Sequence, residues 1–202
     1  MHDFVYLASQ SPRRRQLLAQ IGVEHRLLLA DDAEDAEALE ALQAGELPGD
    51  YVRRVTLLKL RAARRRLQRR ELPAAPILCA DTTVAVGRRI LGKPQDAEEA
   101  ATMLRALSGR GHRVLTAVAV SHGRRDLLLT QTSRVRFAQL PRPIIDAYVA
   151  SGEPFGKAGA YAVQGVIAGW IERVEGSYSG IMGLPLYETT ELLRTARVRL
   201  RI

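Results

Sequence analysis

The sequence predicts an α/β protein with a mixed, twisted sheet and flanking helices. Short apolar runs of strand length are interspersed with longer segments whose apolar residues recur at helical spacing. Two strand-like runs, 114–120 and 127–137, are separated by a short polar turn around Gly123, which is typical of an antiparallel hairpin. Because strands and helices are mixed along the chain and at least one hairpin is present, we expect a mixed α/β sheet.

Capping signals mark the first elements. Residues 4–8 form a short apolar run, as in a buried strand. Ser11 and Pro12 suit the N-cap and the first position of a helix, and Gly22 is placed to end that helix. A second strand is expected at 24–29, so the chain begins as strand, helix, strand.

A long helix is expected after an acidic loop. Residues 30–50 are acidic and rich in Ala and Gly, which predicts a loop with a short helical piece. Asp50 is expected to cap a helix that runs to about Arg70. After a linker, residues 77–80 have the length and flanks of a buried strand, and residues 83–86 continue as extended chain.

The second half carries similar start and stop signals. Gly87 and Gly92 bracket a turn, and Asp96 with Glu99 forms a capping-box start for a helix that ends near Gly109. The further expected elements are a helix at 143–150, a Gly-rich irregular stretch at 151–186 with a strand at 170–174, and a closing helix at 188–195.

Length and composition indicate one globular domain, 1–202. Hydrophobic residues make up 47% of the 202 residues and charged residues 26%, which is enough to bury a sizeable core. No apolar run approaches the roughly 20 residues that span a bilayer, and the first residues carry no signal-peptide pattern. The single cysteine, Cys79, excludes internal disulfides and lies in a predicted buried strand. We therefore expect a cytoplasmic protein with no membrane partner.

The positive charge predicts an anionic partner. The formal net charge is +8 at pH 7, and much of the excess lies on the long predicted helix. A solvated helix face is the favoured interpretation, with a nucleic-acid patch as the alternative. Aromatic residues, at 5%, do not interleave with the arginines as a platform for single strands would require. The arginines of this helix are Arg53, Arg54, Arg61, Arg64, Arg65, Arg66, Arg69 and Arg70.

Lysine is rare in this chain. Only Lys59, Lys93 and Lys157 occur among the 30 basic residues, and the rest are arginine. An ammonium is a compact point charge with three donors, whereas a guanidinium is a flat fork. The three lysines are therefore candidates for crowded positions beside phosphate oxygens, with chance survival at the surface as the alternative.

The start of the first predicted helix suits a phosphate. A helix N-terminus offers free backbone N–H groups and a partial positive charge. Arg13 and Arg14 add guanidinium forks that match phosphate oxygens, and Ser9 and Ser11 add hydroxyl donors. An ordinary capped helix with exposed arginines is the alternative. The chain lacks the Gly-x4-Gly-Lys-Ser/Thr pattern of P-loop nucleotidases.

A carboxylate interrupts a buried strand. Asp81 lies in the otherwise apolar run 77–86, where a charge is costly unless it is paired, hydrogen-bonded or bound to a metal. Asp81 could bind a metal, act as general base on water, or do both. Lys59 lies on the apolar stripe of the long helix and needs an acidic or phosphate partner unless it snorkels outward. An acidic cluster suits a hard divalent cation or a solvated loop, and comprises Asp31, Asp32, Glu34 and Asp35.

Several ordered motifs carry a resemblance to a known family. They are Leu7-Ala8-Ser9-Gln10-Ser11-Pro12-Arg13-Arg14; Ala80-Asp81-Thr82-Thr83-Val84; Gly92-Lys93-Pro94 with Asp96; Met103-Leu104 to Leu107-Ser108-Gly109, with His112 to Thr116; Gly152-Glu153-Pro154 through Ala158-Gly159-Ala160-Tyr161 to Gln164-Gly165; Gly176-Ser177-Tyr178; and Gly183-Leu184-Pro185-Leu186. With these motifs the chain resembles the Maf family of nucleoside triphosphate pyrophosphatases over nearly its whole length.

The resemblance implies hydrolysis of a nucleoside triphosphate to monophosphate and pyrophosphate, with a divalent metal, Mg²⁺ or Mn²⁺. It implies a single domain with the Maf/ITPase-like fold, in which two lobes surround a nucleotide-binding cleft, and a role in housecleaning of the nucleotide pool. Asp81 matches the proton acceptor and a metal position, and Lys59 and Lys93 match catalytic positions near the phosphates. The phosphate-binding positions match Ser9, Ser11 and Arg14.

The resemblance also bears on base choice. Arg13, Thr82 and Gln164 match positions linked to it, and the segment that holds Gln164 is similar to the dTTP/UTP enzymes rather than the 7-methyl-GTP branch. The expected substrates are dTTP, UTP and modified pyrimidine nucleotides, with a 7-methyl-GTP-type activity as the alternative. One departure concerns the metal site. The family's Asp-Val-Asp-Glu is Asp32-Ala33-Glu34-Asp35 in this chain. The predicted metal ligand Asp35 is therefore one methylene shorter than the family's glutamate. The sequence leaves open whether the protein is a homodimer.

Overall fold

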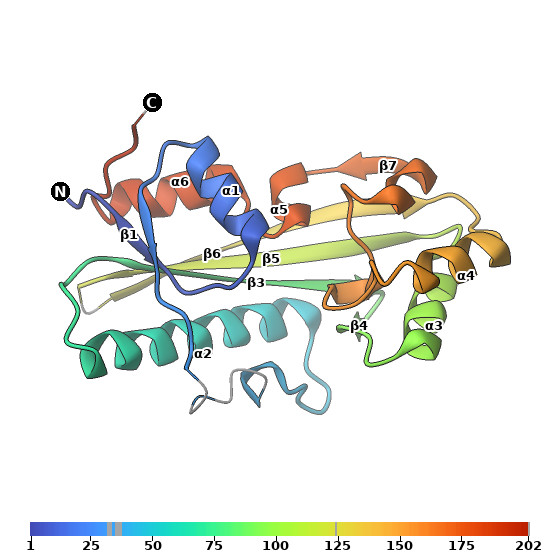
Figure 1. Ribbon diagram of the computed structural model, residues 1–202, viewed down its shortest axis with the longest axis horizontal. Helices are drawn as coiled ribbons and strands as arrows, with labels where there is room; N and C mark the ends of the chain where they lie inside the picture. The colour runs from blue at the N-terminus through green and yellow to red at the C-terminus, as the bar shows by residue number, and fades with distance from the viewer. Residues whose placement is uncertain (32–33, 35–37, 124, 202) are drawn as a thin grey trace.

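The computed structural model describes residues 1–31, 34, 38–123 and 125–201. In this part of the chain a seven-stranded sheet has the order β2-β1-β3-β5-β6-β7, with β4 paired to β3 beside this path (Figure 1). The β1–β2 and β1–β3 pairs are parallel and the other pairs are antiparallel, so the predicted mixed α/β sheet is confirmed. The strands are β1 (Val5–Leu7), β2 (His25–Leu27), β3 (Ile77–Val86), β4 (Arg89–Leu91), β5 (Gly111–His122), β6 (Arg125–Phe137) and β7 (Ile171–Glu175).

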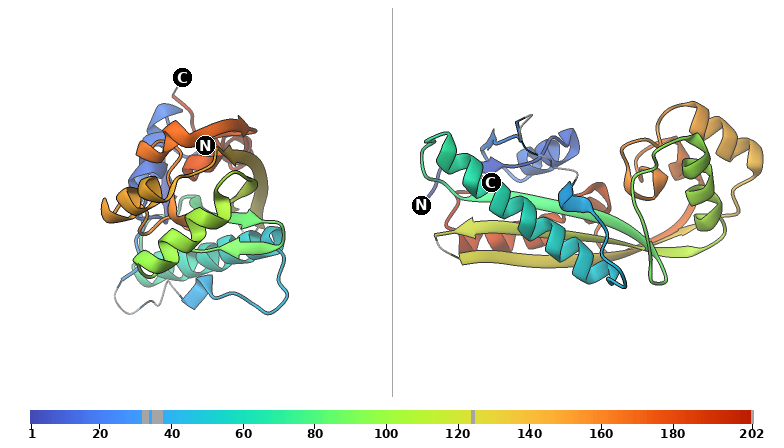
Figure 2. Two further views of the ribbon diagram at one scale, coloured as in Figure 1. Left: turned by 90° about the vertical axis from the view of Figure 1, so that its right-hand side faces the viewer. Right: turned by 90° about the horizontal axis from the view of Figure 1, so that it is seen from below.

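Helices cover both faces of the sheet. Figure 1 shows α2 along one face, where it packs against β3 and β5, and shows α1 and α6 on the opposite face. In Figure 2, α3 and α4 gather at the end of the long strands that lies away from both termini. The helices are α1 (Pro12–Gln20), η1 (Ala38–Glu40), α2 (Pro48–Arg69), α3 (Ala97–Leu107), α4 (Arg142–Ala150), η2 (Ala158–Ala160), η3 (Val166–Trp170), α5 (Tyr178–Met182) and α6 (Leu186–Thr195).

The long central strands join hydrophobic clusters at the two ends of the molecule. Leu104 of α3 and Phe137 of β6 belong to the cluster under α3 and α4, whereas Leu18 of α1 and Leu193 of α6 belong to a cluster at the other end. A third cluster joins Leu60 of α2 to the face of the sheet that α2 covers. Each of these side chains is fully buried, which contributes about 1.5–3 kcal/mol apiece in transfer free energy. The assignment of 1–202 to a single domain stays a prediction.

Several predicted elements are confirmed by their local bonds. The Asp96 carboxylate accepts from the Glu99 N–H at 2.8 Å, and the Glu99 carboxylate accepts from the Gln95 N–H at 2.8 Å, so the helix start is held from both sides. The β5–β6 hairpin pairs from His122 with Arg125 to Gly111 with Arg136. No helix in the described residues is long and apolar enough to cross a membrane.

Three local predictions need correction. Asp50 does not cap the long helix, which begins two residues earlier at Pro48, because proline is well suited to the first helical position and Asp50 falls in the first turn. The 87–92 turn contains the short strand β4, which folds back on β3. The 151–186 stretch also contains the short helix α5, which is too short to show a period but is capped by Ser177 Oγ.

Candidate active site

A break in the sheet opens the cleft. On one edge of β3, strand β1 pairs only as far as Leu78, and β4 starts to pair only at Val84. On the other edge, β5 pairs along the whole stretch. Residues 79–83 therefore have a sheet neighbour on one edge alone. A cleft of about 730 Å³ lies at this break, and Asp81 and Thr82 line it.

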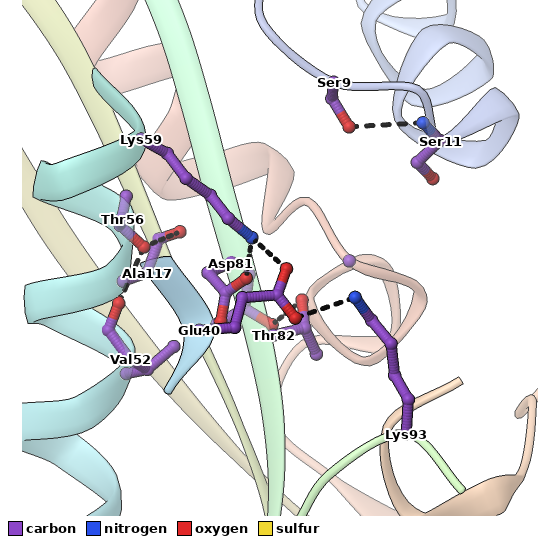
Figure 3. A network of polar contacts seen from close by, with 12 residues as sticks. Ser9, Ser11, Glu40, Val52, Thr56, Lys59, Asp81, Thr82, Lys93 and Ala117 are labelled. Carbon is purple, nitrogen blue, oxygen red and sulfur yellow. Dashed lines mark hydrogen bonds and ion pairs between the residues drawn. The ribbon is translucent and has the colours of Figure 1, made fainter. Parts of the chain in front are cut away.

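The strand carboxylate is paired with a lysine from the helix that covers the sheet. Lys59 Nζ lies 2.6 Å from Asp81 Oδ1 and 2.7 Å from Glu40 Oε1 (Figure 3). The second oxygen of Glu40, Oε2, lies 2.7 Å from Lys93 Nζ. Burial lowers the pKa of Lys59, but the charges of Asp81 and Glu40 outweigh it, and the net shift is upward. Lys59 is therefore a cation at neutral pH.

The start of α1 is tied to the C-terminal segment rather than left open. Arg14 Nε donates to the Gly183 carbonyl at 2.8 Å, Nη1 to Ser9 Oγ at 3.1 Å and Nη2 to Thr82 Oγ1 at 3.4 Å. Gly183 has φ +117°, a conformation in which a side chain would be strained, and this directs its carbonyl at Arg14. Ser11 stands at the N-cap as predicted, but its side chain makes no capping bond, and Ser9 Oγ instead accepts from the Ser11 N–H at 3.2 Å.

The opposite side of the cleft is a closely packed turn segment, 156–164. Gly159 has φ +70°, and a Cβ there would lie 2.9 Å from the Val84 side chain, so only glycine fits against β3. The Tyr161 hydroxyl and His112 Nε2 are 2.7 Å apart within the protein interior. Burial lowers the pKa of His112 to about 4, so the ring is neutral at pH 7. Gln164, three residues further on, has its side chain in the cleft lining and is largely exposed.

Two cations of this side have no carboxylate partner in the described part of the chain. Arg13 and Lys157 both line the cleft, and neither forms an ion pair there. Lys157 Nζ donates to the backbone carbonyl of Glu153. Burial and the neighbouring charge of Arg13 lower the pKa of Lys157, and the charge of Glu153 offsets this only in part.

The cleft brings together the predicted site residues that the structure describes. Its lining includes the predicted catalytic, phosphate and base-choice residues, which come from widely separated parts of the sequence. They are Ser9, Ser11, Arg13, Arg14, Lys59, Asp81, Thr82, Lys93 and Gln164. Asp35, the second predicted metal ligand, lies outside the described residues. The sequence reasoning missed Glu40, because an acid in an acidic loop carries no signal of its own.

The basic helix and the acidic loop neutralise one another. Arg66 is buried, its guanidinium holds both oxygens of Glu34 at 2.6 and 2.8 Å, and it also donates to the Leu28 carbonyl at 2.6 Å. The Arg66 hydrogen bond, against the effect of burial, lowers the pKa of Glu34 to about 2. Asp31 pairs with Arg69 and Arg70. The predicted solvated face is therefore wrong for Arg66, which anchors the loop.

The surroundings of Cys79 and of the acidic side chains in the cleft bear on two kinds of chemistry, thiol reactivity and metal binding. Burial raises the pKa of Cys79 to about 12, in keeping with a core residue. In the described part of the chain no three His, Cys, Asp or Glu side chains gather in a group that could hold a metal ion. Glu34, Glu40 and Asp81 line the cleft, and each is already paired with a basic side chain.

Fold and site together define an α/β protein with a basic cleft at the broken edge of its sheet and a carboxylate on the central strand. The chain belongs to the Maf family, since the family model described as Maf-like protein matches residues 4–196.

Relatives of similar length match along nearly the whole chain. A "dTTP/UTP pyrophosphatase" of Cupriavidus pinatubonensis is 61% identical and covers 98% of this chain and 100% of its own length. A protein of the same name from Albidiferax ferrireducens is 60% identical, covering 96% of this chain and 98% of its own length. Another from Polaromonas sp. is 61% identical, covering 98% of both chains.

Proposed function

We propose that this protein is a nucleoside triphosphate pyrophosphatase that converts dTTP and UTP to the monophosphate and pyrophosphate. The observation that carries the proposal is the Asp81 carboxylate, bonded to Lys59 at the floor of a cleft with more basic than acidic side chains. The near full-length relatives named dTTP/UTP pyrophosphatase support the same activity.

The charges of the cleft suit a polyphosphate. Among its described lining residues, seven are Lys or Arg and three are Asp or Glu, so an anion of high charge is needed to balance it. Lys59 and Lys93 would contact phosphate oxygens as point charges, and Ser9, Ser11 and the start of α1 would add neutral donors. Three N–H donors of Arg14 are already bonded to acceptors within the protein. The role of Arg14 therefore includes holding Ser9 and Thr82 in place.

Asp81 would accept a proton from the attacking water. Its Oδ1 is held by Lys59 at 2.6 Å, which fixes the position of the carboxylate in the cleft. The described residues form no hydrogen bond to its Oδ2, which is therefore the oxygen that can take the proton. The water oxygen adds to the α-phosphorus and the α–β anhydride bond breaks. Pyrophosphate leaves with the electron pair of that bond.

The base would be chosen on the other side of the cleft. The Gln164 amide can donate and accept at once, which matches the adjacent N–H and C=O groups of uracil and thymine. Thr82 Oγ1 lies 3.0 Å from Thr116 Oγ1, so its position is set by the neighbouring strand. Together with Arg13 these residues favour dTTP, UTP and modified pyrimidine nucleotides over 7-methyl-GTP, and suit housecleaning of the nucleotide pool.

The carboxylates of this site suit a divalent cation, Mg²⁺ or Mn²⁺. Such ions are commonly held by one or two carboxylates with substrate phosphates and water completing the shell. Asp81 and Asp35 are the candidate carboxylate ligands. When bound, the cation would neutralise phosphate charge and polarise the anhydride.

The test is a panel of nucleoside triphosphates with Mg²⁺ or Mn²⁺, scored for pyrophosphate release. We expect dTTP and UTP to have the highest kcat/KM, with turnover lost when EDTA removes the metal. Release of orthophosphate in place of pyrophosphate, or a preference for 7-methyl-GTP, would contradict the proposal. The nucleic-acid alternative is disfavoured because five of the eight arginines of the basic helix form ion pairs within the protein.

A further inference from the structure

The carboxylate of Glu40 lies between two lysines that the substrate needs. One oxygen accepts from Lys59 Nζ at 2.7 Å and the other from Lys93 Nζ at 2.7 Å (Figure 3). A carboxylate that bridges two ammonium groups resembles a phosphoryl group in charge sign and in the spacing of its oxygens. We propose that Glu40 is an internal competitor of the substrate's phosphate groups, which must displace its carboxylate to reach Lys59 and Lys93.

The inference rests on the proposed function, in which these two lysines contact phosphate. It adds Glu40, a residue of the acidic 30–50 segment that the motifs do not include. Lys59 comes from α2 and Lys93 from the segment after β4, so Glu40 also links two separate parts of the cleft wall. A bound phosphate would take over that link.

The backbone of Glu40 is held in place, so its side chain is delivered to this position. The Tyr51 hydroxyl, at the start of α2, donates to the Glu40 carbonyl at 3.0 Å. Burial raises the pKa of the Glu40 carboxyl, but Lys59 and Lys93 together outweigh it, and the net shift is downward. Glu40 is therefore an anion at neutral pH and competes with full charge.

The contact is weak enough to be displaced. Side-chain exposure is 26% for Glu40, 20% for Lys59 and 47% for Lys93, so solvent screens both pairs. Partly exposed ion pairs contribute little each, and a site that is open only part of the time binds with an affinity reduced by that fraction. Neutralising Glu40 should therefore tighten phosphate binding by about three- to tenfold.

The experiment measures binding of inorganic pyrophosphate in the presence of Mg²⁺ by isothermal titration calorimetry, where no turnover occurs. Glu40→Gln keeps the size of the side chain and removes its charge. We expect its Kd for pyrophosphate to be about three- to tenfold lower than that of the unmodified protein. Tyr51→Phe, which releases the Glu40 backbone, should shift Kd in the same direction by less.

The matched control is Glu46→Gln. Glu46 lies in the same loop and pairs with Arg54 at 2.6 Å, but it is not part of the cleft lining. This variant should bind pyrophosphate like the unmodified protein. An unchanged or higher Kd in Glu40→Gln would overturn the competitor role while leaving the proposed hydrolysis intact. Absence of pyrophosphate binding by every variant would overturn both.

Discussion

The two sides of the cleft handle charge differently. On the α2 side, Lys59 and Lys93 share the Glu40 carboxylate, and Lys59 also holds Asp81. On the side of 156–164, Arg13 and Lys157 line the cleft with no carboxylate partner in the described part of the chain. The first side is balanced within the protein and must exchange partners to bind an anion. The second keeps its shape by neutral packing and needs no exchange.

The neutral packing explains how unpaired cations can be held in place. Tyr161 and His112 are hydrogen-bonded in the interior, and Gly159 lies directly against β3. Since these contacts carry no charge, they do not respond to an arriving phosphate. The α2 side would thus respond to phosphate by exchanging ion pairs, whereas the segment that carries Gln164 is packed by uncharged contacts.

Replacing the Asp81 carboxylate should have the largest effect on turnover. Asp81→Asn is nearly isosteric but can neither accept a proton nor balance Lys59, so kcat should fall by about 10²–10⁴. Steady-state pyrophosphate release measures it. Asp126→Asn is the control, because Asp126 pairs with Arg64 away from the cleft and should leave kcat near its original value. Near-normal turnover by Asp81→Asn would remove Asp81 from the mechanism.

A substitution at Gln164 should change base preference without altering the ion pairs of the α2 side. Gln164→Ala should reduce the preference for dTTP over 7-methyl-GTP by about 10- to 100-fold, because a base loses paired hydrogen bonds in the cleft. The ratio of the two kcat/KM values gives the answer, with Gln16→Ala on the exposed face of α1 as control. An unchanged ratio would make Gln164 a structural residue and leave base choice to Arg13 and Thr82.

An unpaired cation should act through binding alone. Lys157→Gln should raise KM for dTTP about tenfold and change kcat less than twofold, because a charged hydrogen bond to an anionic ligand is lost and no carboxylate loses an ion-pair partner. Arg53→Gln, an exposed cation outside the cleft, is the control. If kcat fell as far as in Asp81→Asn, the division between the two sides would be wrong.

The buried, uncharged contact between His112 and Tyr161 should make the stability of the protein depend on pH. The pKa of His112 is lowered to about 4, so between pH 6.5 and 4 the unfolded chain takes up the proton more readily than the folded one. The stabilisation is complete above about pH 6.5 and is lost as pH falls toward 4, amounting to about 2 kcal/mol between pH 7 and pH 5.

Urea unfolding at pH 7 and pH 5 measures this effect. His112→Gln cannot titrate but can still reach the Tyr161 hydroxyl, so it should lose most of that pH dependence and keep its dTTP preference. A variant with the same loss of stability at pH 5 would show that other groups are responsible.

Features that depend on near neighbours in the chain could be predicted from the sequence alone. The capping box of Asp96 and Glu99 closes within four residues, and the β5–β6 hairpin closes over a short turn. Asp81 was identifiable because a charge in an apolar strand needs a partner. Such signals are readable because local geometry fixes which side chains meet.

Contacts between distant segments of the chain determine which side chains complete the cleft. Glu40 meets Lys93 across 53 residues, and Arg14 meets the Gly183 carbonyl across 169. The opening beside Asp81 exists because β1 and β4 leave residues 79–83 unpaired on one edge of β3. Periodicity and capping specify each element, but they do not specify where separate elements stop against one another. That is set by how the elements pack, and packing depends on contacts that lie far apart in the chain.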